Sequence, residues 1–240
     1  MDQEDFKKNK ILGREILHNK ILEVFKSYNP VAIHQFGSGV NGYRDEFSDM
    51  DIWVTFEDEV IDEIVSKRDE IYSKIAPVLI KNEKPENSPL GGKYSMVIFE
   101  TDHGLYHVDT YLSKRSQTNI RPEAIFHHGS DELQRGEWIL DSNAREEENP
   151  AIVLDFLICM IFIGIKMVVR KNTEFLDFLC TSYNREKLKY FPELKDIEKK
   201  YDFEMLYNML NELDTEANSR QEHAIEKIKD YYNQVRAVYE

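Results

Sequence analysis

The sequence predicts an α/β (α+β) N-terminal domain with a small mixed sheet, followed by an all-helical C-terminal domain. Apolar residues that alternate with polar ones, as in 50–56, are typical of strands and mark the first 145 or so residues. From Pro150 onward, apolar residues recur at helical spacing. The charged segment REEEN before Pro150 indicates the boundary, so the domains are expected at 1–147 and 148–240.

The elements of the first domain follow from these patterns and from turn residues. Asn29-Pro30 ends a helix that begins near residue 5, and a tight turn at 102–104 joins two strands. The expected helices are 5–26 and 57–79, and the expected strands are 31–36, 50–56, 94–101, 105–112 and 138–140.

The second domain is expected to hold four helices, at 151–169, 173–190, 194–210 and 216–239. The longest apolar run, FLICMIFIGI at 156–165, is closed by Asp155 and Lys166 and is too short to span a bilayer, so we expect a buried helix. The first ten residues do not form a signal peptide, and the two cysteines suggest no disulfide framework. These features favour a cytoplasmic protein with no membrane partner.

The composition limits the classes of function. The chain has 240 residues, of which 41% are hydrophobic and 32% charged, which is typical of a globular protein. Its net charge of -14 argues against binding to duplex nucleic acid, which needs a basic surface. The same charge suits a small cationic partner.

Three carboxylates are candidates for a metal site. Asp49 and Asp51 stand two apart at the start of a strand and project from one face, and Asp109 lies in the middle of a later strand. The turn Gly37-Ser38 precedes them and can present backbone N–H groups to an anion. If the strands are neighbours, the carboxylates converge beside a turn ready for phosphate. Such ligands suit Mg²⁺, and two Mg²⁺ ions would support a displacement at phosphorus.

These residues carry a family resemblance. Phe36-Gly37-Ser38, then ten residues, then Asp49-Met50-Asp51-Ile52 resembles the signature of the polymerase-β-type nucleotidyltransferase superfamily. Asp109 matches the third acidic position of that family. The helical second half is similar to the bacterial antibiotic nucleotidyltransferases, which act on aminoglycosides or lincosamides. Minimal nucleotidyltransferases of toxin–antitoxin modules share the motif.

The resemblance implies roles for these residues. Gly37 and Ser38 would hold the nucleoside triphosphate, and Asp49 and Asp51 would ligate Mg²⁺. Asp109 would be a third metal ligand or the general base. Two further residues are expected to bind phosphate. Arg44 would contact a phosphate group, and Lys166, one helical turn before Arg170, would reach the triphosphate.

The resemblance also implies an activity. The enzyme would transfer a nucleoside monophosphate, AMP from ATP, to a hydroxyl of an aminoglycoside or lincosamide antibiotic, with release of pyrophosphate. Antibiotic resistance would be its role. The alternative is a toxin–antitoxin component that modifies a protein or RNA. Whether the active form is a homodimer stays open.

Plainer interpretations of the acidic motif stand beside these. Ser48-Asp49 would fit an ordinary turn, and Asp109 would fit a surface charge on an edge strand. Arg44 is interpreted first as a solvated loop charge, and Lys166 either extends to solvent or points into a cleft.

The histidines and aromatic residues also have plainer interpretations. We expect His103 and His107 on a hairpin surface rather than at a metal, and His127-His128 in a loop. The aromatic residues Tyr106, Tyr111, Phe126 and Trp138 are expected in the core, with a role in a ligand pocket as the alternative.

Overall fold

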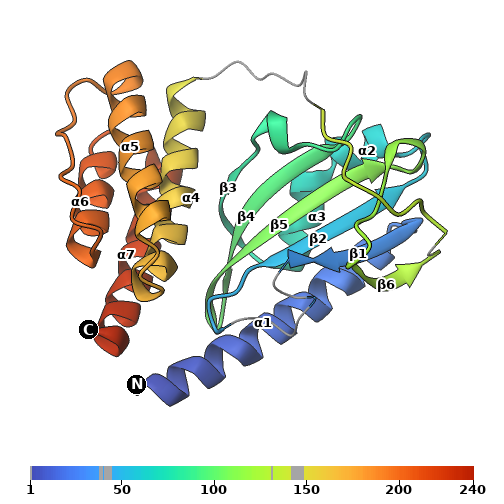
Figure 1. Cartoon of the computed structure of the whole chain (residues 1–240), viewed down its shortest axis with the longest axis horizontal. Coiled ribbons are helices and arrows are strands. Elements are labelled where there is room, and N and C mark those ends of the chain that lie inside the picture. Colours follow the sequence, from blue (N-terminus) through green and yellow to red (C-terminus); the bar gives the residue numbers. More distant parts are fainter. Residues whose placement is uncertain (1, 38–39, 41–44, 131, 142–148) are drawn as a thin grey trace. The chain divides into compact units, whose positions relative to one another are not determined.

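A mixed sheet forms the centre of the N-terminal half. The computed structural model describes residues 2–37, 40, 45–130, 132–141 and 149–240. The sheet has six strands in the order β3-β4-β5-β2-β1-β6 (Figure 1). Strand β2 pairs in parallel with β5, whereas the pairs β1–β2, β4–β5 and β1–β6 are antiparallel. The strands are β1 (Ala32–Phe36), β2 (Met50–Phe56), β3 (Val78–Asn82), β4 (Lys93–Thr101), β5 (Gly104–Lys114) and β6 (Ile125–Gly129).

Helices precede, interrupt and follow the strands. Three of them belong to the N-terminal half: α1 (Gln3–Lys26), α2 (Ile61–Ser66) and α3 (Arg68–Ile75). The C-terminal half contains α4 (Pro150–Val169), α5 (Thr173–Tyr190), α6 (Phe203–Asp214) and α7 (Ser219–Tyr239). The N-terminal half also includes the short 3₁₀ helices η2 (Pro85–Asn87) and η3 (Arg115–Gln117). The predicted succession of a mixed sheet and a helical region is therefore confirmed.

The chain divides into two compact units. One consists of Lys7–Val78 and Glu83–Glu146, and the other of Met1–Phe6, Leu79–Asn82 and Glu147–Glu240. We call them the sheet unit and the helical unit.

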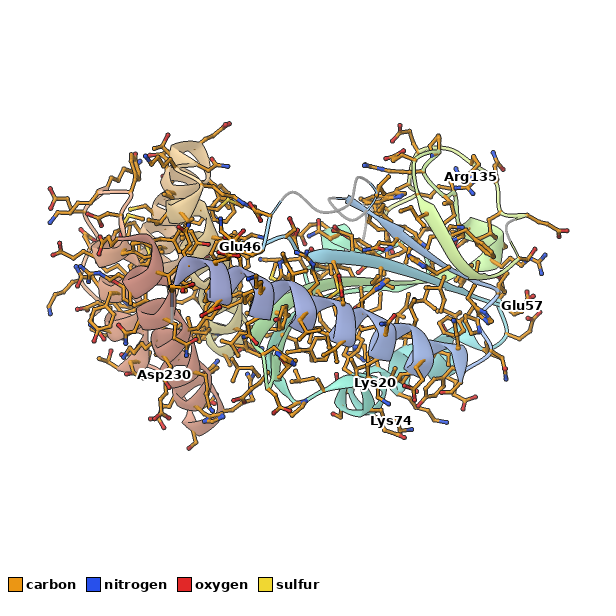
Figure 2. All side chains as sticks on the ribbon, turned by 90° about the horizontal axis from the view of Figure 1, so that it is seen from below. Lys20, Glu46, Glu57, Lys74, Arg135 and Asp230 are labelled. Carbon is orange, nitrogen blue, oxygen red and sulfur yellow. The ribbon has the colours of Figure 1, made fainter. Side chains whose placement is uncertain are left out.

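One face of the sheet is buried under α1, α2 and α3. Side chains of β2 alternate, so that Met50, Ile52 and Val54 point into this core while Trp53 joins a separate cluster on the other face. Figure 2 shows α1 lying over the strands of the sheet. The helices contribute Leu17, Ile21, Val24, Phe25, Ile61, Ile64, Ile71, Tyr72 and Ile75 to this core.

A smaller aromatic cluster covers part of the opposite face. Phe36 and Trp53 are buried in it, and Tyr111 and Trp138 pack against them. The rings of Trp53 and Tyr111 are stacked, with centroids 5.1 Å apart and an interplanar angle of 5°. Because β2 and β5 are paired directly at these residues, the stack follows from the strand register.

The helical unit is built around α4. Asn149 caps the helix by accepting a hydrogen bond from the backbone N–H of Ile152. A Cβ on Gly164 would lie 2.9 Å from Leu179 of α5 and 3.0 Å from Leu206 of α6, so the glycine permits close packing of the three helices. The expectation of a buried helix is confirmed, since 67% of its most apolar 18-residue stretch is buried. The length of the apolar run does not exclude a membrane span, however, because the helix has 20 residues and is long and apolar enough to cross a membrane by length and composition alone.

Two strands were missed because their local patterns are weak. The predicted helix 57–79 is in fact α2 and α3, and the chain then turns into β3, whose last residues were expected to be loop. Strand β6 contains His127 and His128, which were also expected in a loop. It forms because β1 offers its unpaired edge, so tertiary pairing outweighs the polar sequence.

Two further elements differ from expectation. Residues 138–140 form no strand, and Leu140 makes only an isolated bridge with Pro89. The predicted helix 194–210 begins only at Phe203, because Asp202 caps it by accepting from the backbone N–H of Met205.

Candidate functional site

The three predicted carboxylates lie on neighbouring strands of the sheet unit. Asp51 of β2 and Asp109 of β5 are paired in the parallel register, and Asp49 directly precedes β2. The neighbours of Asp109 at 108 and of Asp51 at 50 and 52 point into the helix-covered core. Strand alternation therefore places both carboxylates on the opposite face, beside the aromatic cluster.

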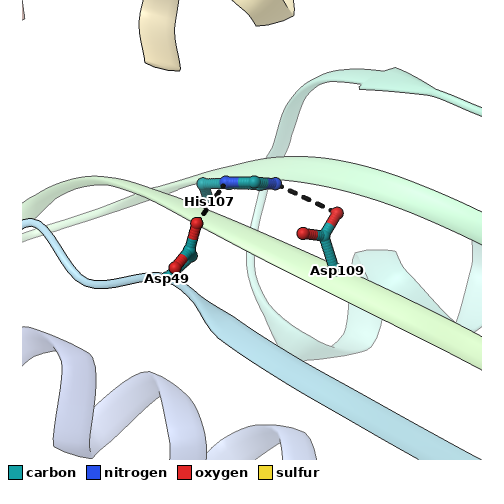
Figure 3. Close-up of side chains that lie close together, drawn as sticks. All are labelled: Asp49, His107 and Asp109. Atoms are coloured by element: carbon teal, nitrogen blue, oxygen red, sulfur yellow. Dashed lines mark hydrogen bonds and ion pairs between the residues drawn. The ribbon is translucent and has the colours of Figure 1, made fainter. Parts of the chain in front are cut away.

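A histidine joins two of these acids. His107 Nε2 lies 3.1 Å from Asp109 Oδ1, and His107 Nδ1 lies 3.4 Å from Asp49 Oδ2 (Figure 3). One ligand atom from each of the three residues falls within 4.8 Å of the others. The side chains of His107, Asp109 and Asp49 are 6%, 14% and 27% exposed, so the cluster is largely shielded but open on the side of Asp49.

Two tyrosines connect this cluster to the aromatic residues. Tyr94 of β4 donates a hydrogen bond to Asp109 Oδ1 at 2.6 Å, which fixes the orientation of the carboxylate. Burial raises the pKa of the Tyr111 phenol, and the carboxylates of Asp109, Asp51 and Asp49 raise it further. All three acids thus act on one side chain, as expected if they share one site.

The turn residue Gly37 lies against Asp51. Phe36 and Asp51 are paired across β1 and β2, so the chain leaves β1 next to that carboxylate. Gly37 has φ of +67°, and a Cβ there would lie 2.0 Å from Asp51 Oδ2. Only glycine satisfies both conditions.

The segment before β2 is held by local bonds and by α1. The backbone N–H of Asp45 donates to Ser48 Oγ at 3.1 Å, so the expected turn chemistry is present. Arg14 of α1 donates to the carbonyl of Asp45 at 2.8 Å. An ordinary turn and a functional site are not exclusive interpretations of Ser48-Asp49, because the turn positions Asp49.

The structure excludes one alternative for the strand of Asp109 and corrects one expectation. β5 lies inside the sheet between β4 and β2, so the alternative interpretation of Asp109 as a surface charge on an edge strand does not hold. His107 is not a hairpin surface residue, although His103 lies at the hairpin turn, where its Nδ1 is 2.8 Å from Asn9 Oδ1. The spacing His-x-Asp within a strand places both side chains on one face, and this signal was available in the sequence.

The other residues predicted for the site or for the core lie in different surroundings. Ser38 and Arg44 lie outside the described residues. Lys166 belongs to α4 of the helical unit and is 7% exposed, so it does not extend to solvent. Of the aromatic residues expected in the core, Tyr106 is buried, Tyr111 and Trp138 are half-buried, and Phe126 is exposed.

The donor set fits a divalent cation. Two ligands in adjacent positions of an octahedral ion, each about 2.1 Å from it, are about 3.0 Å apart. His107 Nε2 and Asp109 Oδ1 are 3.1 Å apart and share a hydrogen bond in this structure, so an ion at this spacing would take the place of the shared proton. Among the residues that the structure describes, Asp49, His107 and Asp109 are the histidine, cysteine or acidic side chains that come close enough together, three or more at once, to share an ion.

Comparisons with known proteins identify no family. No family model and no curated protein matches the chain. Two solved structures share some similarity, a STING-associated CdnE c-di-GMP synthase from Capnocytophaga granulosa and the CdnE cyclic dinucleotide synthase of Elizabethkingia meningoseptica with GTP and Apcpp. The first has TM-score 0.30 and 15% identity over 97% of this chain and 82% of that one. The second has TM-score 0.29 and 11% identity over 90% of each chain. Likeness at this level carries no argument about fold or function, and neither structure is described as an antibiotic-modifying enzyme.

Proposed function

We propose that this protein is a metal-dependent nucleotidyltransferase whose centre is Asp49, Asp51 and Asp109. The observation that carries the proposal is the placement of Asp51 opposite Asp109 in the sheet, with Asp49 close to Asp109 and Gly37 against Asp51 at the end of β1. Carboxylates on one face of a sheet beside a glycine turn suit a metal–triphosphate complex. A bound divalent ion would neutralise charge on the phosphate oxygens.

The side chains of the chain would have separate tasks. Asp49 and Asp51 would hold the ion, and Asp109 would either hold it or take the proton from the acceptor hydroxyl. Tyr94 keeps the Asp109 carboxylate in place through its 2.6 Å hydrogen bond. Gly37 and Ser38 would offer backbone N–H groups to the triphosphate.

The second unit and the acceptor complete the proposal. We assign the helical unit to binding of the acceptor, with Arg44 and Lys166 as phosphate-binding residues. AMP from ATP would pass to a hydroxyl of a small molecule, and pyrophosphate would leave. The net charge of -14 supports a cationic acceptor such as an aminoglycoside, with a lincosamide as the second choice.

Pyrophosphate release tests this proposal. The assay contains ATP or GTP, Mg²⁺ or Mn²⁺, and either no added acceptor or one from a panel of aminoglycosides and lincosamides. Asp49→Asn and Asp51→Asn should each reduce release by at least about 1,000-fold, because the amide cannot supply the negative charge. Asp102→Asn is the matched control, since Asp102 is exposed at the turn between β4 and β5. It should leave the rate unchanged.

The outcomes separate the possibilities. Release that needs one acceptor and both aspartates establishes the small-molecule reaction and its substrate class. Release without an added acceptor points to transfer onto a second nucleotide or onto water. Retained activity in both Asn variants contradicts the assignment of the site. If no mixture releases pyrophosphate while nucleotide binds, protein and RNA acceptors become the next substrates to test.

A further inference from the structure

The strand that carries Asp109 also carries a nitrogen ligand. His107 stands between Tyr106 and Val108, whose side chains enter the helix-covered core, so the imidazole must lie on the face of Asp109. Its two ring nitrogens face Asp109 and Asp49 at 3.1 and 3.4 Å. Figure 3 shows the ring lying between the two carboxylates.

The strand arrangement limits how far this imidazole can withdraw. Val97 and Ile98 of β4 are paired with Val108 and His107, and β2 pairs with the other edge of β5 from Val108 onward. The His107 side chain is 6% exposed. An ion that binds Asp49 and Asp109 therefore meets the imidazole, unless that ring rotates away from both acids.

The chemistry of the donors distinguishes between ions. Mg²⁺ strongly prefers oxygen ligands in near-ideal octahedral geometry. Imidazole nitrogen suits transition ions rather than Mg²⁺. Among the transition ions, Mn²⁺ shares with Mg²⁺ the preference for carboxylates, so mixed carboxylate and imidazole ligands point to Mn²⁺ or a similar transition ion. One imidazole beside the carboxylates of the proposed centre makes the donor set mixed, and a mixed set favours a transition ion over Mg²⁺.

We propose that His107 is a direct metal ligand and that it makes this site select Mn²⁺, or a transition ion of similar chemistry, over Mg²⁺. The inference deepens the proposed function, since it concerns the ion at the same site. It changes the expectation from the sequence, where Mg²⁺ was the ion and His107 had no role.

Mn²⁺ binding by the full chain, without nucleotide or acceptor, tests the inference. Electron paramagnetic resonance gives the amount of bound Mn²⁺ and its displacement by Mg²⁺. Electron spin-echo modulation from ¹⁴N reports whether an imidazole ligates the ion. We compare wild type with His107→Asn and, as matched control, with His103→Asn, because His103 lies on the same hairpin and contacts Asn9 instead of the acids.

The expected result has two parts. Wild type and His103→Asn should prefer Mn²⁺ over Mg²⁺ by about tenfold or more, and both should show ¹⁴N modulation. His107→Asn should lose the modulation and most of the preference. Wild-type Mn²⁺ bound without ¹⁴N modulation, or an unchanged Mn²⁺/Mg²⁺ ratio in folded His107→Asn, overturns the inference and leaves His107 as a partner that balances the acids. Should His107→Asn not fold, the modulation in wild type still decides.

The readouts separate this inference from the proposed function. ¹⁴N-ligated Mn²⁺ in a chain that releases no pyrophosphate would retain the inference and remove the nucleotidyltransferase. Pyrophosphate release with an ion that shows no nitrogen ligand would do the reverse.

Discussion

Gly37 shows how a single residue can be required twice. Its φ of +67° disfavours any residue with a Cβ, and the Asp51 carboxylate occupies the space that a Cβ would need. Gly104 has φ of +108° but no described atom within 4 Å of the same position, so it shares the backbone requirement without the clash. Substitutions at Gly37 and at Gly104 therefore allow the effect of backbone strain to be measured separately from the effect of displacing Asp51.

We expect Gly37→Ala to lower pyrophosphate release by about 100-fold, because Asp51 must move to admit the methyl group. Gly104→Ala should lose about 1–2 kcal/mol of stability through backbone strain and keep its activity. Steady-state rates and urea unfolding of both variants give the comparison. Equal activity in the two would show that the contact between Gly37 and Asp51 is not needed for the reaction.

His18 of α1 and His127 of β6 create a pH dependence at the junction of two elements. Their ring centroids are 5.0 Å apart. Burial, assisted by His127, lowers the pKa of His18 from 6.5 to about 4, and burial also lowers the pKa of His127. The fold thus favours neutral rings, whereas the unfolded chain takes up protons near its ordinary pKa.

The free energy of unfolding should therefore fall as the pH drops from about 6.5 to about 4. The stabilisation from the neutral His18 ring is fully present above pH 6.5, and below pH 4 no further loss from this group is expected. After allowance for the half-exposed position of His18, we expect a loss of about 1–2 kcal/mol. Urea midpoints measured from pH 8 to pH 4 should decline less steeply in His18→Gln than in wild type. Parallel curves would place the acid sensitivity elsewhere.

At the level of elements, sequence reasoning succeeded where the local pattern and the fold agree. β2 was predicted with its observed bounds, because its alternation matches a strand with one face in a core. β6 could not be predicted, since its polar sequence becomes a strand only through pairing with β1. Asp49 and Asp51 were singled out by their spacing and Asp109 by its place in a strand, but the approach of these strands depends on the parallel pairing of β2 and β5, which joins residues more than 50 positions apart.

His107 was missed for a different reason. Its spacing to Asp109 was visible, but the expected metal site was judged by whether a third soft ligand stood nearby in sequence. The partner is Asp49, which is distant in sequence and comes close only through the sheet.

In the helical unit, Asp155 links α4 to the start of α7. Arg220 donates to both of its oxygens at 2.7 and 2.6 Å, and Gln221 donates to Oδ1 at 2.7 Å. The Asp155 side chain is 15% exposed, whereas Asp177 binds Lys199 at 2.6 Å with both side chains 47% exposed. Asp177 also accepts a hydrogen bond from Tyr201 at 2.6 Å, so the two acids differ mainly in shielding.

Asp155→Ala should cost about 2–3 kcal/mol, because it leaves two donors of α7 without their acceptor. Asp177→Ala should cost less than about 1 kcal/mol, as is usual for exposed ion pairs. Urea unfolding followed by far-ultraviolet circular dichroism measures both. Similar losses in the two variants would contradict the assigned importance of the link between α4 and α7.

For the whole molecule, charge is unevenly balanced. The chain carries 45 acidic and 31 basic residues, for a net charge of -14. Two effects of salt then oppose each other: screening weakens the ion pairs at the surface, and it also weakens the repulsion among the excess acids. Exposed pairs contribute little individually, so we expect the general repulsion to dominate.

Raising NaCl from about 20 to about 200 mM shortens the screening length from about 20 to about 7 Å, which is smaller than the distances over which the excess acidic residues repel one another. Stability at pH 7.5 should therefore rise, by an amount on the order of 1 kcal/mol.

Cation binding at the Asp49–His107–Asp109 cluster would imitate this effect. The urea midpoints are therefore measured with chelator present, in wild type and in an Asp49→Asn, Asp109→Asn double variant. A rise shared by both proteins reflects screening, and a rise confined to wild type reflects an ion at the cluster. A lower urea midpoint in both proteins at high salt would mean that the surface ion pairs stabilise the fold more than repulsion among the excess acids destabilises it.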